Sequence, residues 1–216
     1  MKVKHFILDI DGTIWNTTPV VAIAWNKAIQ EGAPKEIENL KITAQMLQKE
    51  FGKPMDVIAD NLFGPIDAKD KANLLELCCE YEHDIIDACE DDLTYPNVAD
   101  TILKMKEEHR FYIVSNCQDG YVELVMKKTG ITDVVTDYEC FGHTGLQKAD
   151  NVKLILERNQ IQPKDAYYIG DIQGDCDSAH QAGIRFIHAS YGFGEVADAD
   201  YSIQSFDELM ELVTKL

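Results

Sequence analysis

Acidic and small polar residues gather in three short segments, each of which directly follows an apolar run. The segments are Asp9 with Asp11 after a run that ends at Leu8, Ser115-Asn116 after Phe111–Val114, and Asp171 with Asp175 after Ala166–Ile169. If the runs are parallel strands, their carboxyl ends share one sheet edge, where ligands bind in open α/β folds. Four carboxylates at one edge repel one another unless some are protonated or a cation joins them. Mg²⁺, which prefers oxygen ligands and shares substrate phosphate oxygens, would satisfy such a cluster.

Each segment also has a purely structural interpretation. Asp9 and Asp11 could form a turn and a helix cap, because Asp favours both positions. Ser115-Asn116 could be an ordinary helix N-cap. Asp171 and Asp175 precede or open a predicted helix, whose N-terminus favours acidic residues in any case. The choice between these interpretations depends on the elements that carry the residues.

Two kinds of sequence pattern divide the chain. A strand is expected over Lys2–Leu8, and apolar positions then repeat at helical spacing through residues 17–94 without a convincing strand. After Tyr95-Pro96, strands and helices alternate. The expected strands are Phe111–Val114, Val134–Tyr138, Ala166–Ile169 and Arg185–Ala189; the expected helices lie near Gly120–Thr129, Asn151–Asn159 and Cys176–Ala182, with a last one starting at Ser205, which has capping-box spacing with Glu208.

Repeated strand–helix units predict a parallel sheet covered by helices on both faces. Because one strand precedes the helical stretch and the others follow it, the economical arrangement is a helical insertion in an α/β domain. We therefore predict an α/β protein with a Rossmann-like core formed by residues 1–16 and 95–216. Residues 17–94 are predicted to form an inserted, all-helical domain.

The composition excludes several classes of protein. The chain has 216 residues, 45% hydrophobic and 27% charged, which is enough apolar material to bury a core. Twenty Lys and Arg against 38 Asp and Glu give a formal net charge of −18, which opposes binding to nucleic acid or an anionic membrane. No apolar run approaches the roughly 18 residues of a membrane span, and a secretory signal pattern is missing. We expect a cytoplasmic protein that is a monomer or a weak homodimer.

The cysteines and histidines show no spacing typical of a metal site. The six cysteines lack a Cys-x-x-Cys pair, and we interpret them as reduced thiols because disulfide frameworks belong to smaller secreted chains. The six histidines are all interpreted as residues without a metal role. Zinc is therefore not expected from the sequence.

Taken in order along the chain, four motifs resemble those of the haloacid dehalogenase superfamily, in its phosphatase branch with a helical cap inserted after the first motif. The motifs are Asp9-Ile-Asp11-Gly12-Thr13, Val114-Ser115-Asn116, Lys148, and Gly170-Asp171-Ile-Gln-Gly-Asp175. The resemblance covers the whole chain and is greatest to phosphoglycolate phosphatases. It implies a Mg²⁺-dependent phosphohydrolase that acts on a small phosphorylated metabolite, with the cap closing over the site.

The resemblance also implies a role for each motif residue. Asp9 would attack phosphorus and form an aspartyl-phosphate, while Asp11 would act first as general acid and then as general base. The substrate phosphate would be held by Ser115, Asn116 and Lys148. The metal ligands would be Asp9, Asp11 through its main-chain carbonyl, Asp171 and Asp175.

Departures from the family pattern are few. Ala149-Asp150 follows Lys148 where the family often has proline, which leaves the lysine's placement open, with Lys153 as a weaker alternative. Ile172 replaces a frequent threonine. The alternative functions are a sugar phosphomutase of the same fold and a non-catalytic phosphate-binding module. A dehalogenase is less consistent with the sequence, because that branch lacks the second acid of the first motif and Asp11 is present.

Overall fold

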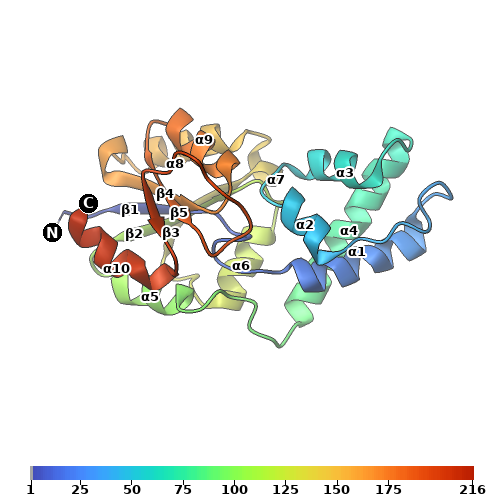
Figure 1. Cartoon of the computed structure of the whole chain (residues 1–216), viewed down its shortest axis with the longest axis horizontal. Coiled ribbons are helices and arrows are strands. Elements are labelled where there is room, and N and C mark those ends of the chain that lie inside the picture. Colours follow the sequence, from blue (N-terminus) through green and yellow to red (C-terminus); the bar gives the residue numbers. More distant parts are fainter. Residues whose placement is uncertain (1) are drawn as a thin grey trace. The chain divides into compact units, whose positions relative to one another are not determined.

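The structure is a computed structural model that describes residues 2–216 (Figure 1). The chain divides into two compact units. One consists of Met1–Asn16 with Leu93–Leu216, and the other of Thr17–Asp92. We call the first the core unit and the second the helical unit. No helix among residues 2–216 combines the length and the apolar character that crossing a bilayer requires.

The core unit is built on a parallel sheet. Its strands, within the described residues, are β1 (His5–Leu8), β2 (Arg110–Ser115), β3 (Val135–Cys140), β4 (Ala166–Gly170), β5 (Arg185–Ala189) and β6 (Tyr201–Ile203). They are arranged in the order β3-β2-β1-β4-β5-β6, with every neighbouring pair parallel. The first strand therefore lies in the middle of the sheet, between β2 and β4. The prediction of an α/β protein with a Rossmann-like parallel sheet is confirmed.

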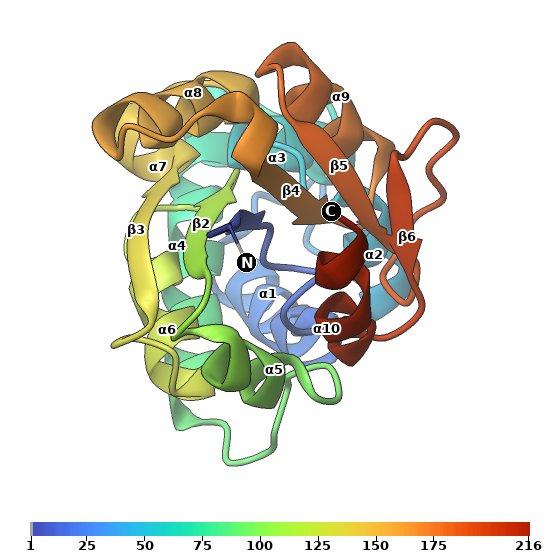
Figure 2. The same cartoon turned by 90° about the vertical axis from the view of Figure 1, so that its left-hand side faces the viewer.

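Helices cover both faces of this sheet. They are α5 (Val98–Met105), α6 (Tyr121–Thr129), α7 (Phe141–Thr144), α8 (Lys148–Arg158), α9 (Gln173–Gln181) and α10 (Leu209–Leu212), together with short 3-10 turns at Pro163–Asp165, Phe206–Glu208 and Val213–Lys215. In Figure 2, which looks along the strands of the core unit, α8 and α9 lie on one face and α5, α6 and α10 on the other.

Alternating side chains make both faces of the central strands apolar. Ile7 pairs in register with Tyr112 and Tyr168, and these three pack in one buried cluster with residues of α8 and α9. On the opposite face, the Phe6 ring centroid lies 5.6 Å from that of Phe111 and 5.9 Å from that of Tyr167. A strand buried on both faces is the expected environment for an apolar run in a parallel sheet.

The helical unit contains four helices and no strand within the described residues. They are α1 (Thr18–Gly32), α2 (Ala44–Glu50), α3 (Met55–Phe63) and α4 (Ala68–Ala88). Trp25 of α1 is fully buried, and its indole N–H donates to Glu82 Oε2 of α4 at 2.8 Å. The ring of Trp25 also packs against Phe63 of α3, with 5.8 Å between ring centroids. One large side chain thus joins three of the four helices.

The C-terminal segment differs from the prediction in its local geometry. Instead of a regular helix from Ser205, a 3-10 turn covers Phe206–Glu208 before α10 begins. The Ser205 side chain caps no backbone N–H, so the predicted capping box is wrong. Glu208 instead accepts a hydrogen bond from the backbone N–H of Gln204 at 2.8 Å. In a capping box the Glu208 carboxylate would accept from the backbone N–H of Ser205, but here it accepts from the residue before.

Candidate active site

Three buried carboxylates converge at the carboxyl ends of β1 and β4. Asp9 follows β1 and its backbone N–H donates to Ile169 O of β4 at 2.9 Å, so the two strand ends are joined directly. Asp171 follows β4, and Asp175 lies in the first turn of α9. Each of the three is at most 1% exposed, and each has a carboxylate oxygen within 4.8 Å of one from each of the others.

Lys148, the first residue of α8, lies between two of these carboxylates. Its ammonium donates to Asp9 Oδ1 at 2.8 Å and to Asp175 Oδ1 at 2.6 Å, and the side chain is 3% exposed. The helix begins three residues earlier than the sequence pattern indicated, so the lysine belongs to its first turn. Lys153, by contrast, forms an exposed pair with Asp150 at 3.0 Å. The missing proline has therefore not displaced Lys148 from the cluster.

Burial and mutual repulsion raise the pKa values of Asp9 and Asp171. Burial raises the pKa of Asp9 to about 6, with Asp175 adding to the rise and Lys148 opposing it. Burial raises the pKa of Asp171 to about 8, and repulsion from Asp175 and Asp9 adds to the rise. Burial alone would lower the pKa of Lys148, but the attraction of Asp175 and Asp9 outweighs it and the pKa is raised well above its usual value. Lys148 is therefore a stable cation.

This cluster fits a divalent cation. Three carboxylates and one ammonium leave a surplus of negative charge in a place where an unpaired charge is costly. The donors are all oxygen atoms, as Mg²⁺ prefers. Gly12, at φ +90°, leaves room for Asp171: a Cβ at Gly12 would lie 2.1 Å from Asp171 Oδ2. The donor set and the space around it suit Asp9, Asp171 and Asp175 as metal ligands.

A loop that the sequence analysis did not single out fixes Asp171. The backbone N–H of Phe193 donates to Asp171 Oδ2 at 2.6 Å. The adjacent Gly192 approaches so closely that a Cβ there would lie 2.3 Å from the Cβ of Asp171. The pair of glycines around Phe193, soon after a predicted strand, was the available sequence signal. The sequence alone does not show that this segment contacts Asp171, which lies 22 residues before Phe193.

Asp11 occupies a different position from the other acids. Its Oδ1 accepts hydrogen bonds from Trp15 Nε1 at 3.1 Å and from the Tyr121 hydroxyl at 3.0 Å. The two aromatic rings meet edge to face, with 5.7 Å between centroids. The Asp11 carboxylate is thus oriented by two neutral donors, separately from the carboxylates that share Lys148. Neither Trp15 nor Tyr121 was among the predicted site residues.

Ser115 and Asn116 lie at the same edge of the sheet. Ser115 is the last residue of β2, which is the neighbour of β1, and Asn116 follows it. Both side chains are buried. Their placement at a strand end beside Asp9's strand is compatible with phosphate binding, which stays a prediction for both residues.

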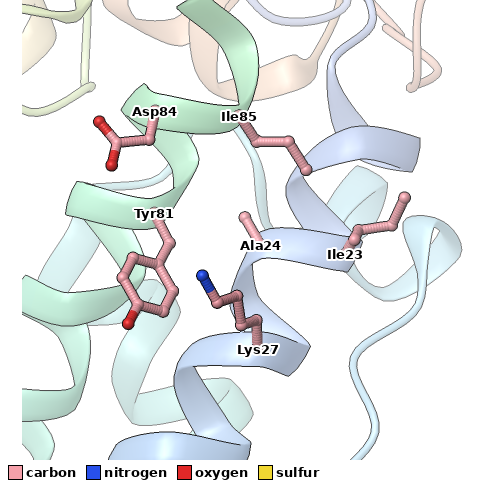
Figure 3. Close-up of a pocket in the computed structure, with 6 residues that line it drawn as sticks. All are labelled: Ile23, Ala24, Lys27, Tyr81, Asp84 and Ile85. Atoms are coloured by element: carbon pink, nitrogen blue, oxygen red, sulfur yellow. The ribbon is translucent and has the colours of Figure 1, made fainter. Parts of the chain in front are cut away.

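The helical unit has a shallow hollow of about 240 Å³ between α1 and α4 (Figure 3). It is lined by Ile23, Ala24, Lys27, Tyr81, Asp84 and Ile85. The Lys27 ammonium lies 4.4 Å from the centre of the Tyr81 ring, a cation–π contact. With one amine and one carboxylate on an apolar floor, this hollow lacks the converging acids of the core unit, which remains the candidate site for catalysis.

The sheet topology and the acidic edge together define an α/β protein with a Rossmann-like core, whose candidate site follows the central strands. The chain belongs to the haloacid dehalogenase-like hydrolase family, whose model matches residues 6–189. The predicted family is confirmed. Its curated relatives, which match nearly the whole chain, are phosphatases, and the predicted enzyme class, a phosphoric monoester hydrolase, is thereby confirmed.

Curated relatives match the chain over nearly its whole length. The phosphoglycolate phosphatase of Nitrosospira multiformis is 24% identical and covers 100% of this chain and 97% of its own. That of Mannheimia succiniciproducens is 26% identical, with 95% and 96% covered. Among solved structures, a predicted phosphoglycolate phosphatase from Haemophilus somnus has a TM-score of 0.84 at 19% identity, covering 99% of both chains.

The same fold also occurs in a phosphomutase. The β-phosphoglucomutase of Clostridium difficile has a TM-score of 0.77 at 16% identity and covers 99% of this chain and 96% of its own. At such identities the likeness concerns the fold alone. The fold therefore does not by itself separate hydrolysis from phosphoryl transfer to a sugar.

Proposed function

We propose that this phosphatase is Mg²⁺-dependent, acts on a small organic phosphate monoester of the phosphoglycolate kind, and works through an aspartyl-phosphate. The observation that supports the proposal most is the buried group of Asp9, Asp171 and Asp175 around Lys148. It combines a nucleophile, a fixed cation and an oxygen-only ligand set at one edge of the sheet. The phosphoglycolate phosphatase relatives support the class of substrate.

In this proposal Asp9 is the nucleophile. Its carboxylate oxygen forms a bond to phosphorus while the bond from phosphorus to the ester oxygen breaks. Although burial raises the pKa of Asp9 to about 6, the group is still ionised above neutral pH, where it can attack. Lys148 holds one oxygen of Asp9 in a hydrogen bond of 2.8 Å and so limits its rotation. Because the nucleophile is already held in place, less entropy is lost on reaching the transition state, and the barrier is lower.

Asp11 is the proposed general acid and base. It gives a proton to the departing alkoxide and takes one from the water that cleaves the acyl phosphate, which returns both residues to their starting states. Trp15 and Tyr121 fix the carboxylate by donating to the same oxygen, Oδ1. The carboxylate that these two donors orient is the group we assign to proton transfer.

Asp9, Asp171, Asp175 and the main-chain carbonyl of Asp11 are the residues proposed to hold Mg²⁺. When bound, the ion supplies positive charge that stabilises the phosphoryl oxygens. Ser115, Asn116 and the ammonium of Lys148 are assigned to the same oxygens. The Phe193 N–H, by binding Asp171 Oδ2, holds that ligand in a single orientation.

The helical unit, Thr17–Asp92, is proposed to act as a cap that restricts the site to small substrates. We also propose that the protein works in the cytoplasm, because no disulfide joins its six cysteines in the described chain. A small phosphorylated metabolite is the proposed partner, whereas a nucleic acid or a membrane is not.

The test is phosphate release by the purified protein from a panel of esters, with Mg²⁺ and with EDTA. The panel contains phosphoglycolate, sugar phosphates, nucleotides and pyrophosphate. We expect Mg²⁺-dependent release, fastest from a small carboxylated or hydroxylated ester. Full activity after exhaustive chelation would contradict the metal dependence. Conversion of a sugar 1-phosphate into its 6-phosphate without net phosphate release would identify a mutase instead.

A further inference from the structure

A short segment after β5, residues 190–194, lies against the acid cluster of the core unit, and we call it the 190–194 loop. Its first residue, Ser190, donates to the carbonyl of Ile203 in β6 through its backbone N–H at 3.0 Å and its hydroxyl at 2.9 Å. At the other end of the loop, His188 Nε2 lies 3.2 Å from the carbonyl oxygen of Gly194. Polar contacts at both ends therefore fix this loop to the sheet.

The middle of the 190–194 loop approaches two parts of the candidate site at once. A Cβ at Gly192 would lie 2.3 Å from Asp171 Cβ and 2.3 Å from the carbonyl oxygen of Gly12. Contacts this short are repulsive, so only a glycine lets the backbone pass here. Gly192 thus packs between Asp171 and the turn of the first motif, next to Asp11, whose main-chain carbonyl is a proposed metal ligand.

Tyr191 joins the loop to the same turn through its side chain. Its hydroxyl donates to the carbonyl of Thr13 at 2.8 Å, although the two residues are 178 positions apart. Thr13 is the last residue of the first motif, and its own backbone N–H donates to Ile10 O at 3.1 Å. The acceptor of the tyrosine is therefore a backbone group of a closed turn, and the hydrogen bond holds the turn against the loop.

A second aromatic residue holds the ring of Tyr191. The Tyr95 ring meets it edge to face, with 4.9 Å between centroids and 61° between planes. This is a favourable arrangement for an aromatic pair. The backbone N–H of Tyr95 in turn donates to the carbonyl of Ile14, the residue after Thr13, at 3.0 Å. The ring is thus supported from a segment that is itself attached to the first-motif turn.

We propose that Tyr191 is a positioning residue for the metal site, and that it acts through its hydrogen bond to Thr13. The hydroxyl keeps the first-motif turn, which carries the Asp11 carbonyl, at a fixed distance from the loop that holds Asp171. Mg²⁺ demands near-ideal octahedral geometry, so ligands that are already in place raise its affinity. This role depends on the proposed Mg²⁺ site, although Tyr191 itself is assigned neither to the ion nor to the substrate.

A purely structural role for Tyr191 leads to a different expectation. In that case, loss of the hydrogen bond lowers the stability of the metal-free protein and leaves the ion affinity of the folded protein unchanged. A positioning role lowers the affinity itself, because the folded protein must then bring its ligands together when the ion binds. Ion affinity measured without substrate therefore separates the two roles.

The test is Mn²⁺ titration of the full-length, metal-stripped protein at pH 8, followed by electron paramagnetic resonance of the free ion. Mn²⁺ shares the preference of Mg²⁺ for carboxylate and carbonyl oxygen. We expect one bound ion per chain, which excess Mg²⁺ displaces. Tyr191→Phe, which removes the hydroxyl and keeps the ring on Tyr95, should weaken Mn²⁺ binding by about 5- to 10-fold, the effect of one ordinary hydrogen bond.

Two further variants test how specific this effect is. Gly192→Ala should weaken Mn²⁺ binding at least as much as Tyr191→Phe, because the added methyl group displaces the loop from Asp171. Tyr138→Phe is the matched control, since it also removes a tyrosine hydroxyl of the core unit, one that donates to Glu123 at 2.9 Å on the surface. This control should bind Mn²⁺ with wild-type affinity.

Turnover gives a second readout. Tyr191→Phe should need about 5- to 10-fold more Mg²⁺ for its half-maximal rate, by the same loss of one hydrogen bond. At saturating Mg²⁺ it should regain the wild-type kcat with an unchanged KM for the ester, because every proposed ligand is still present. A kcat that stays low at saturating Mg²⁺ would contradict a role that is confined to positioning the metal ligands.

Asp171→Asn distinguishes a failure of the metal site from a failure of the role assigned to Tyr191. If the unaltered protein binds no Mn²⁺, or Asp171→Asn binds it with wild-type affinity, the proposed metal site and the role of Tyr191 are both refuted. If Asp171→Asn loses binding while Tyr191→Phe keeps wild-type affinity, only the role of Tyr191 is refuted. An equal loss of affinity in Tyr138→Phe would refute that role as well.

Discussion

The Lys148 ammonium lies 2.8 Å from Asp9 Oδ1, and both side chains are almost completely removed from solvent. Asp175 accepts from the same ammonium at 2.6 Å. Lys148, which is the third motif, thus forms ion pairs with Asp9 of the first motif and Asp175 of the fourth. Removing one partner of a buried ion pair is strongly destabilising, because the remaining charge is uncompensated.

Lys148→Met should therefore destabilise the metal-free protein by roughly 3 kcal/mol. The substitution keeps most of the side-chain length and removes the positive charge between Asp9 and Asp175. Urea denaturation at pH 8 without divalent metal measures the effect. The control is Lys153→Met, which breaks only the exposed pair with Asp150 and should change the free energy of unfolding by less than about 0.5 kcal/mol. Equal effects of the two substitutions would contradict the proposed strength of the Lys148 pair.

The metal-free protein should lose stability as the pH rises from about 4 to about 8. The pKa of Asp171 is raised from 3.8 to about 8 and that of Asp9 from 3.8 to about 6, so the folded state binds more protons than the unfolded state in this window. The stability that these groups contribute is fully present below the unfolded pKa and is lost as the pH passes the folded pKa. Denaturation curves at several pH values measure this slope.

Mg²⁺ should reverse that trend, because binding requires the ionised carboxylates. We expect a larger increase in melting temperature on adding Mg²⁺ at pH 8 than at pH 5. In Asp171→Asn, which removes the most strongly shifted acid, the pH slope of the metal-free protein should be shallower. A Mg²⁺ effect that is the same at both pH values would argue against binding at these acids.

The fold was predictable because its signals are local and repeated. Apolar runs such as Ala166–Ile169 correspond to strands buried on both faces, and β5 was placed at its observed bounds. The edge strand β6 and the helix α5 were not predicted. β6 has only three residues and α5 only eight, so each offers a short pattern. Their structure depends on neighbours that a sequence window does not contain.

The site was predictable only as a set of residues at strand ends. Asp9 follows β1 and Asp171 follows β4. Because these two strands are parallel neighbours, the two acids lie at the same edge of the sheet. How the acids are held is a tertiary property: Phe193 donates to Asp171, and Tyr121 to Asp11, from positions 22 and 110 residues away. The catalytic roles themselves stay predictions until the variants are measured.

Asp9→Asn should lower phosphate release by at least about 1,000-fold without unfolding the protein. The amide keeps the shape of the carboxylate but lacks the charge needed for attack on phosphorus. Steady-state phosphate release and circular dichroism measure the two properties. Asp133→Asn, at an exposed position of the core unit, is the control and should keep wild-type activity. Substantial turnover by Asp9→Asn would exclude Asp9 as the nucleophile.

Tyr121→Phe should lower kcat roughly tenfold with a smaller effect on KM, a loss that corresponds to one hydrogen bond of about 1.4 kcal/mol to a charged group. The substitution removes the hydroxyl that donates to Asp11 Oδ1 and retains the ring that packs on Trp15. If the hydroxyl acts only through Asp11, Tyr121→Phe should have no further effect in an Asp11→Asn background. Additive losses in the double variant would show a separate role for the tyrosine.

Asp11→Asn distinguishes the two proposed roles of the first-motif acids. Alkyl phosphates have poor leaving groups that need a proton, whereas an activated aryl phosphate releases an anion. The variant should therefore lose far more activity on the alkyl ester than in the first step with the aryl ester, measured by single-turnover kinetics.

The asparagine also cannot activate water, so a phosphorylated Asp9 should accumulate and be trapped by acid quench. Because its main-chain carbonyl is retained, Mg²⁺ affinity should fall less than in Asp171→Asn. Equal slowing of good and poor leaving groups, with no trapped phosphoenzyme, would mean that Asp11 is neither acid nor base. Its hydrogen bonds with Trp15 and Tyr121 would then have to be explained by the conformation of the loop alone.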